Sequence, residues 1–333
     1  MSDTYRAVVL TRQGGPEVLE VERFRIEEPG PKQLRVRIRA AGVGATDLAM
    51  LAGKYLFAPK IPFVPGYEIA GVVDAIGSNV HGFKLGQRVA ALTVYGGYGE
   101  LLVRDAEHFL PVPDAVSDVA AAAAILNYVT AWQMIHRTAK VRSGQTALVT
   151  AAGGGVGTAL LQLLRLAGVK TYGAASAKKH GTVSKLGATP IDYTAGRVDQ
   201  LARALEAQGV DYVFDGVGGA NIGLCLSAAK RSGTVIGYGF LAAKGALGAP
   251  AMFANLFVGS RLRGRRGAFY GITYLYRKNP TLFREDLPTI FALIAEQQIA
   301  PLIYMTLPLL AAKQALELLA AGTVEGKIVL TNS

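Results

Sequence analysis

Hydrophobic and polar residues alternate in short runs along the first third of the chain. Three such runs, residues 7–10, 34–39 and 69–73, are separated by turns rich in glycine and proline. In the second run Val36 and Ile38 fall on one face and the arginines around them on the other, because successive side chains of a strand point to opposite faces. The pattern predicts half-buried strands in an antiparallel sheet or partial barrel.

The pattern changes near Asp118, where an alanine-rich helix begins and is followed by alternating apolar runs and helical stretches. The apolar runs are residues 147–151, 169–173, 189–192, 212–215 and 234–237, and the helical stretches are residues 156–167, 178–186, 198–208 and 220–231. Short strands that alternate with helices of this length indicate parallel strands joined by crossovers. The prediction for this part is a doubly wound α/β domain.

The end of the chain returns to mixed structure. Helices are expected over residues 282–298 and 311–321, and a strand over residues 327–330. We expect this last strand to rejoin the first domain, which is then discontinuous. The predicted domains are residues 1–120 with 266–333 for the mainly-β part, and 121–265 for the α/β part.

Composition narrows the classes of function. Hydrophobic residues make up 51% and charged residues 18% of the chain, which argues against disorder. The net charge of +11 comes from scattered lysines and arginines, and no basic helix with interleaved aromatic residues favours nucleic-acid binding. Two explanations of the charge stay open: attraction of an anionic small molecule, such as a phosphorylated cofactor or an acyl thioester, and solubility alone.

Cysteine content and the apolar segments limit the picture further. The single cysteine, Cys225, excludes an internal disulfide and a four-cysteine zinc site, and the four histidines lack metal-ligand spacing. Residues 1–7 carry charge where a secretory signal is apolar, and residues 119–135 fall short of a membrane span. We expect a soluble, cytoplasmic protein with no metal, no nucleic-acid partner and no membrane span.

A glycine-rich turn directly follows the first strand of the α/β pattern and opens the next helix. It consists of Gly153, Gly154, Gly155, Val156 and Gly157. Its glycines allow backbone amides to approach a pyrophosphate, and the helix N-terminus offers free N–H groups and a positive dipole end. This strand–turn–helix context is what a dinucleotide fingerprint requires, and a turn that serves only helix–strand packing is the alternative.

The second strand of the α/β pattern indicates which dinucleotide is bound. An NAD site usually places an acid there to bind the ribose 2′-hydroxyl, but residues 173–180 contain none. Ser176, Lys178 and Lys179 offer a hydroxyl and two cations, which suit a 2′-phosphate. The lysines could instead be solvated residues of a first helical turn, although the helix dipole disfavours lysine in that position. The sequence therefore predicts NADPH as the cofactor.

With these motifs the chain resembles the medium-chain dehydrogenase/reductase superfamily, in its zinc-free quinone oxidoreductase (zeta-crystallin-like) branch. Residues 144–165 are similar to the signature of that branch throughout, and the similarity runs from residues 5–9 to 326–330. The resemblance implies a split, barrel-like, mainly-β catalytic (GroES-like) domain with an inserted Rossmann domain of about six strands. It also implies a homodimer through an edge strand of the Rossmann sheet, for which residues 261–267 are the candidate.

The resemblance assigns substrate residues as well. Zinc-dependent members carry Cys and His where this chain has Ala45 and Tyr67, so catalytic zinc is not expected. Tyr55 and Tyr67 are expected to face the substrate, because a neutral tyrosine hydroxyl can donate to a developing oxyanion. Asp47 is expected to organise the pocket, and Gly44 stands where the branch commonly carries Asn. Each tyrosine could instead be a packing residue.

Further cofactor contacts are implied by the same resemblance: Asn127, Thr130, Tyr193, Gly237, Tyr238, Gly239, Phe240 and Lys327. The function that follows is hydride transfer from NADPH to a quinone or similar α,β-unsaturated carbonyl acceptor. One alternative is an enoyl or alkenal double-bond reductase for CoA- or carrier-linked substrates, which the net charge and the apolar run 247–257 would suit. Another is a protein that binds NADPH without turnover.

Overall fold

The computed structural model describes residues 3–240, 242, 243, 245 and 247–332. The chain divides into two compact units, one formed by residues 1–126 with 276–333 and the other by residues 127–275. The sequence analysis placed the divisions at 120/121 and 265/266. The structure places the first division later within the same helix, α2 (Asp118–Trp132), and it moves the second because β13 (Arg266–Phe269) pairs with β12 (Ala229–Gly237).

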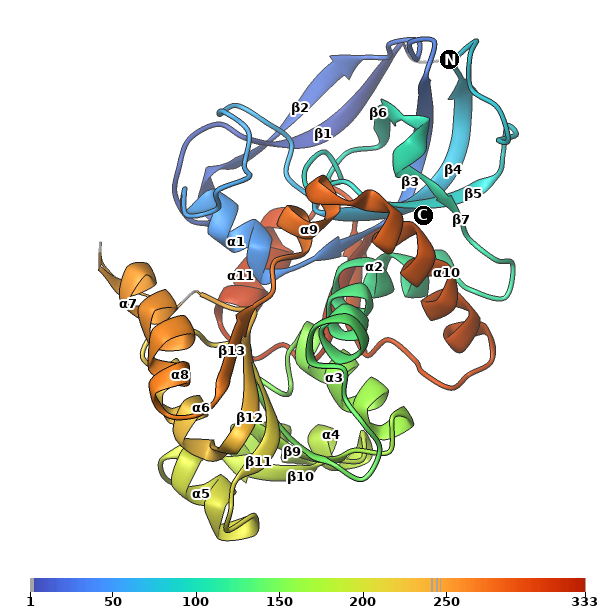
Figure 1. Cartoon of the computed structure of the whole chain (residues 1–333). Helices are drawn as coiled ribbons and strands as arrows, with labels where there is room; N and C mark the ends of the chain where they lie inside the picture. Colours follow the sequence, from blue (N-terminus) through green and yellow to red (C-terminus); the bar gives the residue numbers. More distant parts are fainter. Residues whose placement is uncertain (1–2, 241, 244, 246, 333) are drawn as a thin grey trace. The chain divides into compact units, whose positions relative to one another are not determined.

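The first unit is rich in β-strands (Figure 1). Its main sheet has the order β14-β15-β3-β4-β5-β7, with β6 paired to β3, and β1 and β2 form a separate ribbon. The bounds are β1 Thr4–Leu10, β2 Leu19–Arg25, β3 Gln33–Val43, β4 Glu68–Ile76, β5 Arg88–Leu92, β6 Leu101–Asp105, β7 Leu110–Pro111, β14 Ile303–Pro308 and β15 Lys327–Thr331. Within this unit β14 and β15 pair in parallel, and the other pairs are antiparallel.

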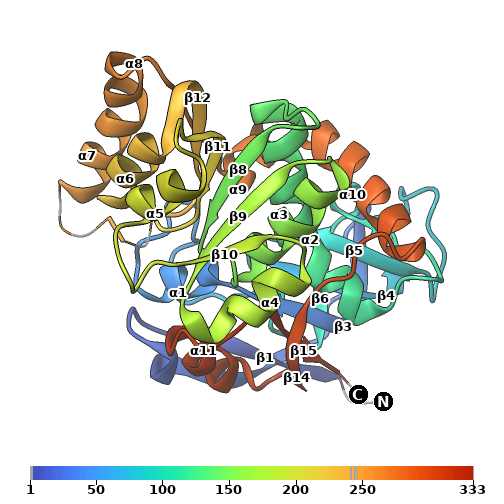
Figure 2. The same cartoon turned by 90° about the horizontal axis from the view of Figure 1, so that it is seen from below.

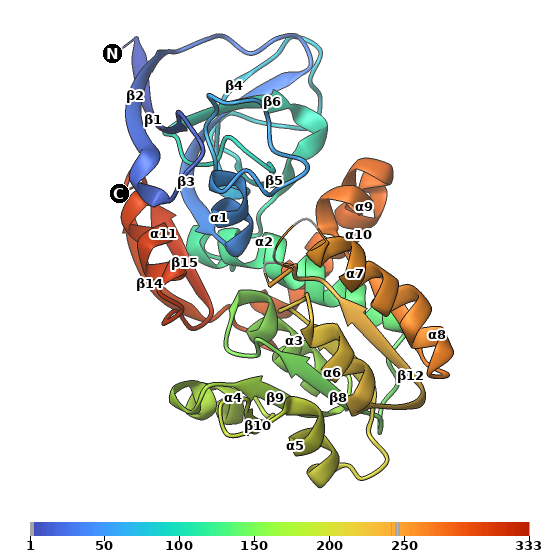
Figure 3. The same ribbon diagram turned by 90° about the vertical axis from the view of Figure 1, so that its left-hand side faces the viewer.

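The alternation in β3 has the predicted effect on burial. Val36 and Ile38 are fully buried, whereas Arg37 and Arg39 are exposed. The last strand, β15, pairs with β3, so the end of the chain completes the first unit as predicted. Figure 3 shows this closure, with β14, β15 and α11 (Ala312–Ala320) from the end of the chain beside β1 and β3 from its beginning. The other helices of this unit are η1 Pro16–Val18, α1 Ala45–Leu51, η2 Ala106–His108 and α10 Pro280–Ala295.

The second unit is built on a parallel sheet with the strand order β10-β9-β8-β11-β12-β13 (Figure 2). In the described part of the chain these six strands run β8 Thr146–Thr150, β9 Lys170–Ala175, β10 Thr189–Asp192, β11 Val210–Asp215, then β12 and β13. Numbered within the unit, the order is 3-2-1-4-5-6, that of a doubly wound Rossmann sheet, as predicted. Ligands of such sheets bind outside the carboxyl ends of the strands where the order reverses, which is here between β8 and β11.

The helices of the second unit follow the predicted alternation, with shorter bounds. They are η3 Gln133–Ala139, α3 Gly155–Leu166, η4 Ala177–Lys179, α4 His180–Lys185, α5 Val198–Leu205, α6 Asn221–Ala228, α7 Gly248–Ala254, η5 Asn255–Gly259 and α8 Ser260–Leu262, and α9 Ile272–Lys278 leads back to the first unit. The helix predicted over residues 220–231 ends at Ala228, because β12 starts at Ala229. The edge strand predicted at residues 261–267 was placed too early, since α8 and a turn come before β13.

Candidate functional site

The glycine-rich turn lies at the carboxyl end of β8 and leads into α3. Ala151 has a left-handed backbone (φ 52°) that turns the chain away from the strand. A Cβ at Gly157 would collide with the carbonyl oxygens of Ala151 and Ala152, and one at Gly155 would lie 2.5 Å from the amide of Asn127. Within the described residues no side chain caps the N-terminus of α3. The turn is therefore tightly packed on the protein side and leaves the first amides of α3 for an anion, so its residues fit a dinucleotide pyrophosphate.

A buried carboxylate that sequence reasoning missed holds the strand ends beneath this turn. Asp215, the last residue of β11, accepts hydrogen bonds from Oγ1 of Thr150 (2.6 Å), the backbone N–H of Gly218 (2.8 Å) and Nδ2 of Asn221 (2.6 Å). Because Thr150 ends β8, these bonds tie together the two strands at the reversal point. The only sequence signal was an acid at the end of an apolar run.

The residues predicted to bind a 2′-phosphate come from the ends of two neighbouring strands. Ser176 follows β9 and Tyr193 follows β10, and the two strands pair in parallel up to their last residues. Lys178 is exposed. Lys179 lies against the glycine turn, since a Cβ at Gly153 would be 2.7 Å from its Cδ. The structure thus places these four residues at or after the carboxyl ends of β9 and β10, with Lys179 against the turn.

The remaining predicted cofactor contacts of this unit lie around the same edge. Asn127 and Thr130 are buried on α2, with Asn127 against Gly155. After β12, Tyr238 donates its backbone N–H to the carbonyl of Asp215 (2.9 Å), which places residues 237–240 against the end of β11. Burial raises the pKa of the Tyr238 hydroxyl, which therefore stays neutral.

In the first unit the structure brings the two predicted substrate tyrosines together. The hydroxyl oxygens of Tyr55 and Tyr67 lie 2.6 Å apart, and the rings meet edge to face with centroids 6.0 Å apart. Tyr67 is buried, whereas Tyr55 is half exposed. Burial, and after it the neighbouring Tyr55, raises the pKa of Tyr67 well above its usual value. The pair therefore offers two hydroxyls that can donate hydrogen bonds, and the hydroxyl of Tyr55 belongs to the more accessible residue.

Asp47 lies in the first turn of α1. One of its oxygens accepts the backbone N–H of Gly44 (2.9 Å), which caps the first turn of the helix. The side chain is completely buried, and desolvation raises its pKa to about 6. The N–H of Gly44, the Tyr98 hydroxyl and the Lys327 ammonium act in the opposite direction. Asp47 therefore lies within a buried polar group and does not face solvent.

Lys327 and Glu68 complete this buried group. They form an ion pair, with 3% and 0% of their side chains exposed, and Glu68 also accepts the backbone N–H of Leu126 (2.5 Å). Lys327 was expected as a cofactor contact, or else as a solvated lysine. The structure instead gives it a buried partner within the first unit. Sequence reasoning assigned no role to Glu68 or to the buried Tyr98.

The positions of the zinc ligands in zinc-dependent relatives fall in the same region. Ala45 is the first residue of α1, and Tyr67 directly precedes β4. Over the described residues there is no group of three or more His, Cys, Asp or Glu side chains that could hold a metal ion. The same part of the chain contains no helix long and apolar enough to cross a membrane.

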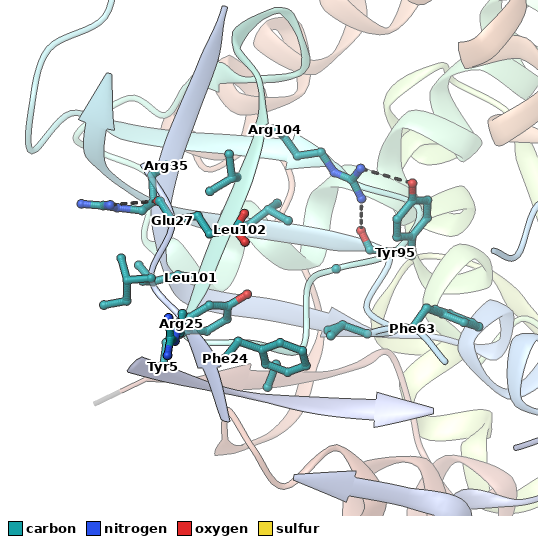
Figure 4. A pocket seen from close by; sticks show the side chains of 15 residues that line it. Tyr5, Phe24, Arg25, Glu27, Arg35, Phe63, Tyr95, Leu101, Leu102 and Arg104 are labelled. Carbon is teal, nitrogen blue, oxygen red and sulfur yellow. Dashed lines mark hydrogen bonds between the residues drawn. The ribbon is translucent and has the colours of Figure 1, made fainter. Parts of the chain in front are cut away.

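A cavity of about 390 Å³ opens elsewhere in the first unit, between β1, β2, β6 and the loops that carry Phe63 and Tyr95 (Figure 4). Arg104 reaches along one side of it, stacks 4.2 Å above the ring of Tyr95 and donates to the Tyr95 carbonyl (2.9 Å). None of the predicted substrate residues lines this cavity. It is therefore not the site formed by the tyrosine pair.

Comparison with known proteins gives family matches over both units. Residues 30–114 match the family model of the alcohol dehydrogenase GroES-like domain, and residues 186–330 match that of the zinc-binding dehydrogenase. Quinone oxidoreductase-like protein 2 homolog of Nematostella vectensis is 31% identical over 332 residues, which cover 98% of this chain and 89% of that protein.

Two further relatives extend the comparison. Synaptic vesicle membrane protein VAT-1 homolog-like of Mus musculus is 38% identical over 235 residues, which cover 70% of this chain and 56% of that protein. The chain thus spans little more than half the length of that relative. Among solved structures, the Escherichia coli quinone oxidoreductase complexed with NADPH superimposes with a TM-score of 0.87 at 25% identity, over 98% of this chain and 100% of that chain.

The buried carboxyl of Asp47 gives a prediction for stability. The pKa of Asp47 is about 6 in the folded protein and about 4 in the unfolded chain. Between about pH 4 and pH 6 the folded protein therefore holds a proton that the unfolded chain has already released. This contribution is fully present below pH 4 and is lost as the pH rises through 6. Asp47→Asn can still accept the N–H of Gly44 but does not titrate. The unfolding free energy of the wild type, relative to Asp47→Asn, should fall by up to about 3 kcal/mol from pH 4 to pH 7.

Urea denaturation of both proteins across this pH range measures the difference. Asp114→Asn, which removes an exposed aspartate of the same unit, is the matched control. A difference between the wild type and Asp47→Asn that does not change with pH would contradict the raised pKa of Asp47.

Proposed function

This chain belongs to the medium-chain dehydrogenase/reductase superfamily, in its quinone oxidoreductase-like branch, and we propose that it is an NADPH-dependent, zinc-independent reductase of a quinone or a similar α,β-unsaturated carbonyl compound. The observation that carries the proposal is the pair of neutral hydroxyls formed by Tyr55 and Tyr67. The pair provides a hydrogen-bond donor in the region where zinc-dependent relatives place a metal ligand.

The glycine turn and its surroundings would hold the cofactor. The first amides of α3 suit the pyrophosphate, and Ser176, Lys178, Lys179 and Tyr193 suit the 2′-phosphate. A bound nicotinamide supplies the hydride. The solved Escherichia coli quinone oxidoreductase, whose fold this chain shares, is described as a complex with NADPH, which supports the choice of cofactor.

The chain itself contributes a hydrogen-bond donor that a second hydroxyl holds in place. Either hydroxyl of the pair can be the donor, and in the arrangement that suits catalysis the buried Tyr67 donates to the oxygen of Tyr55 and holds that hydroxyl in place. Tyr55 is half exposed and offers its own proton to the carbonyl oxygen of the acceptor. A donor held in advance where negative charge develops stabilises the transition state without reorganisation. Burial keeps the pKa of Tyr67 high, so Tyr67 stays neutral, and the proton that the reduced acceptor takes up comes from solvent.

One observation favours an enone over a quinone within this proposal. Gly44 stands where the branch commonly carries Asn, and a Cβ there would come no closer than 3.6 Å to its neighbours. Packing therefore does not require glycine, and the missing amide removes one polar group from the pocket. An acceptor with one carbonyl needs fewer donors than a quinone with two. Reduction of an alkenal or enoyl double bond is thus the second candidate function.

The activity itself is the first test of this proposal. NADPH oxidation should be seen with at least one of three acceptors: 1,4-naphthoquinone, a 2-alkenal or an enoyl thioester. Tyr55→Phe should lower kcat/KM by roughly tenfold to a hundredfold, because it removes one donor to the developing oxyanion. Tyr95→Phe, in the cavity away from the pair, is the matched control and should retain activity.

The metal content of the same preparation completes this test. Elemental analysis should find no stoichiometric zinc, and chelation should leave the rate unchanged. Oxidation of NADPH with none of the acceptors would favour a protein that binds the cofactor without turnover. Activity that is lost together with about one zinc per chain would contradict the zinc-independent mechanism.

Cofactor preference gives the next prediction. The wild type should prefer NADPH to NADH by about tenfold to a hundredfold, since charge-assisted hydrogen bonds to a 2′-phosphate contribute about 1.5–3 kcal/mol each. The double variant Lys178→Ala with Lys179→Ala should raise the apparent KM for NADPH and leave the apparent KM for NADH nearly unchanged. It should also make the KM for NADPH less dependent on salt concentration. Steady-state kinetics with both cofactors at two salt concentrations measures this. Lys185→Ala, at an exposed lysine of α4, is the control; equal loss of both cofactors would mean that the two lysines support only the fold.

We also propose that the protein is a homodimer formed at the β13 edge of the parallel sheet. Val258 and Leu262 are 56% and 83% exposed, one helical turn apart and next to this edge. Of the nearby arginines, Arg265 donates to the carbonyl of Ala229 (2.9 Å), so its guanidinium is held within its own unit and does not point at a second copy as a free charge.

Light scattering at micromolar concentration should give twice the chain mass, and the double variant Val258→Asp with Leu262→Asp should give a monomer. Leu205→Asp, at an exposed leucine of α5, should remain dimeric, and a monomeric wild type would refute the interface.

A further inference from the structure

Arg277 lies next to the tyrosine pair through a series of ring contacts. It belongs to the last turn of α9, and its guanidinium carbon lies 4.9 Å from the centroid of the Phe57 ring. The Phe57 ring meets the Tyr55 ring at 65°, with centroids 5.8 Å apart. All three residues belong to the β-rich unit. A guanidinium therefore stands two ring contacts from the hydroxyl that is proposed to bind the acceptor carbonyl.

This guanidinium has no acidic partner among the described residues. Some arginines of the same unit are paired with carboxylates, as Arg35 is with Asp74 (2.6 Å) and Arg88 with Asp118 (2.7 Å). Arg277 is exposed, and the ring of Phe57 is its one recorded partner in the described part of the chain. The side chain of a solvent-exposed arginine usually samples many rotamers. An aromatic ring beneath the guanidinium restricts that motion.

The surrounding loop has the same sign of charge. Lys54 and Lys60 flank the segment that carries Tyr55 and Phe57, and both are exposed. No ion pair is recorded for either lysine in the described ranges. Where the structure describes the chain, none of these three cations has a carboxylate partner, and their summed field attracts anions.

A stacked guanidinium keeps its N–H groups free at the rim of its plane. These donors match the spacing of two oxygens on a carboxylate, sulfonate or phosphate. We propose that Arg277, ordered by Phe57, forms an anion subsite for the acceptor, so that the substrate is a carbonyl compound with an acidic group at the end remote from the reacting carbonyl. This inference rests on the proposed function, because it takes Tyr55 as the contact to the carbonyl.

The subsite orients the acceptor as well as attracting it. With its acidic end on Arg277, an elongated acceptor would direct its other end toward Tyr55, whose ring also contacts Phe57. A neutral acceptor of the same shape would lack this anchor and would bind through the tyrosine pair and apolar contacts alone. The structure thus predicts a preference that depends on charge at one end of the substrate.

Two acceptors of nearly the same shape, 1,4-naphthoquinone and 1,4-naphthoquinone-2-sulfonate, test the subsite. Arg277→Gln should raise KM about tenfold for the sulfonate, because the variant removes one charge-assisted contact to the sulfonate group. KM for the neutral quinone, which makes no such contact, should change by no more than about twofold. Arg277→Lys should fall between the wild type and Arg277→Gln, because lysine keeps the charge but loses the planar fork. Phe57→Leu removes a ring that contacts both Arg277 and Tyr55, so KM for the sulfonate should rise about threefold more than KM for the neutral quinone.

Controls separate a local effect from a general one. Arg12→Gln removes the same charge from an exposed arginine of the same unit and should change neither acceptor. Added salt should raise KM for the sulfonate in the wild type and have little effect in Arg277→Gln. Equal changes for both quinones, or no change for either, would overturn the subsite.

Failure of the proposed function would be seen separately. If the wild type reduces neither quinone, calorimetric titration with 1,4-naphthoquinone-2-sulfonate still measures binding. Binding that is lost in Arg277→Gln and retained in Arg12→Gln would support the subsite without the reductase activity. Binding that is equal in all three proteins, or absent from the wild type, would refute it.

Discussion

The ion pair between Lys327 and Glu68 is the interaction on which the first unit depends. Lys327 begins β15 and Glu68 begins β4, and these two strands flank β3. The side chains of Lys327 and Glu68 both pack against Gly42 of β3, where a Cβ would collide with both of them. The pair therefore fastens the last strand of the chain to the sheet made by its first third. A buried charge that loses its partner costs about 3–5 kcal/mol, so the lysine and the glutamate need each other.

The position of the tyrosine pair follows from this constraint. Tyr67 directly precedes Glu68, so the anchored start of β4 also fixes the buried hydroxyl. Tyr55 lies on a more exposed loop and meets Tyr67 only through its hydroxyl and ring edge. In the second unit Asp215 has a comparable role without an ionic partner, because neutral donors from Thr150, Gly218 and Asn221 satisfy it. In each unit a buried carboxylate joins elements that are far apart in sequence, and the proposed site is built where they meet.

Local patterns in the sequence predicted the elements and the fold class well. The period-two alternation of β3, the glycine turn before α3 and the strand–helix alternation each depend on neighbours within a few residues. The unit boundaries were harder, because the helical pattern of α2 continues through the division without a break. β13 is only four residues long and follows a run of arginines, so the edge strand was placed over the charged turn that precedes it. The sequence identified Tyr55 and Tyr67, but their hydroxyl contact comes from tertiary structure.

The residues that sequence reasoning missed share a physical cause. Lys327 was expected as a cofactor contact, and its ion pair was not foreseen because Glu68 lies more than two hundred and fifty positions earlier in the chain and the glycine that makes room for the pair carries no chemistry of its own. Arg277 and Phe57 are also far apart in sequence, and only the folded chain places one over the other.

These contacts also give the first unit an electrical polarity. Asp47 and Glu68 lie inside, and both raise the pKa of Tyr67, so the interior favours neutral hydroxyls and disfavours an anion. Arg277, Lys54 and Lys60 lie outside, where an anion is stabilised. An acceptor with one acidic end is therefore drawn to a single orientation, with its charge toward the cations and its neutral carbonyl toward the tyrosines. On the proposed function, the separation of the buried carboxylates from the surface cations selects which end of the substrate is reduced.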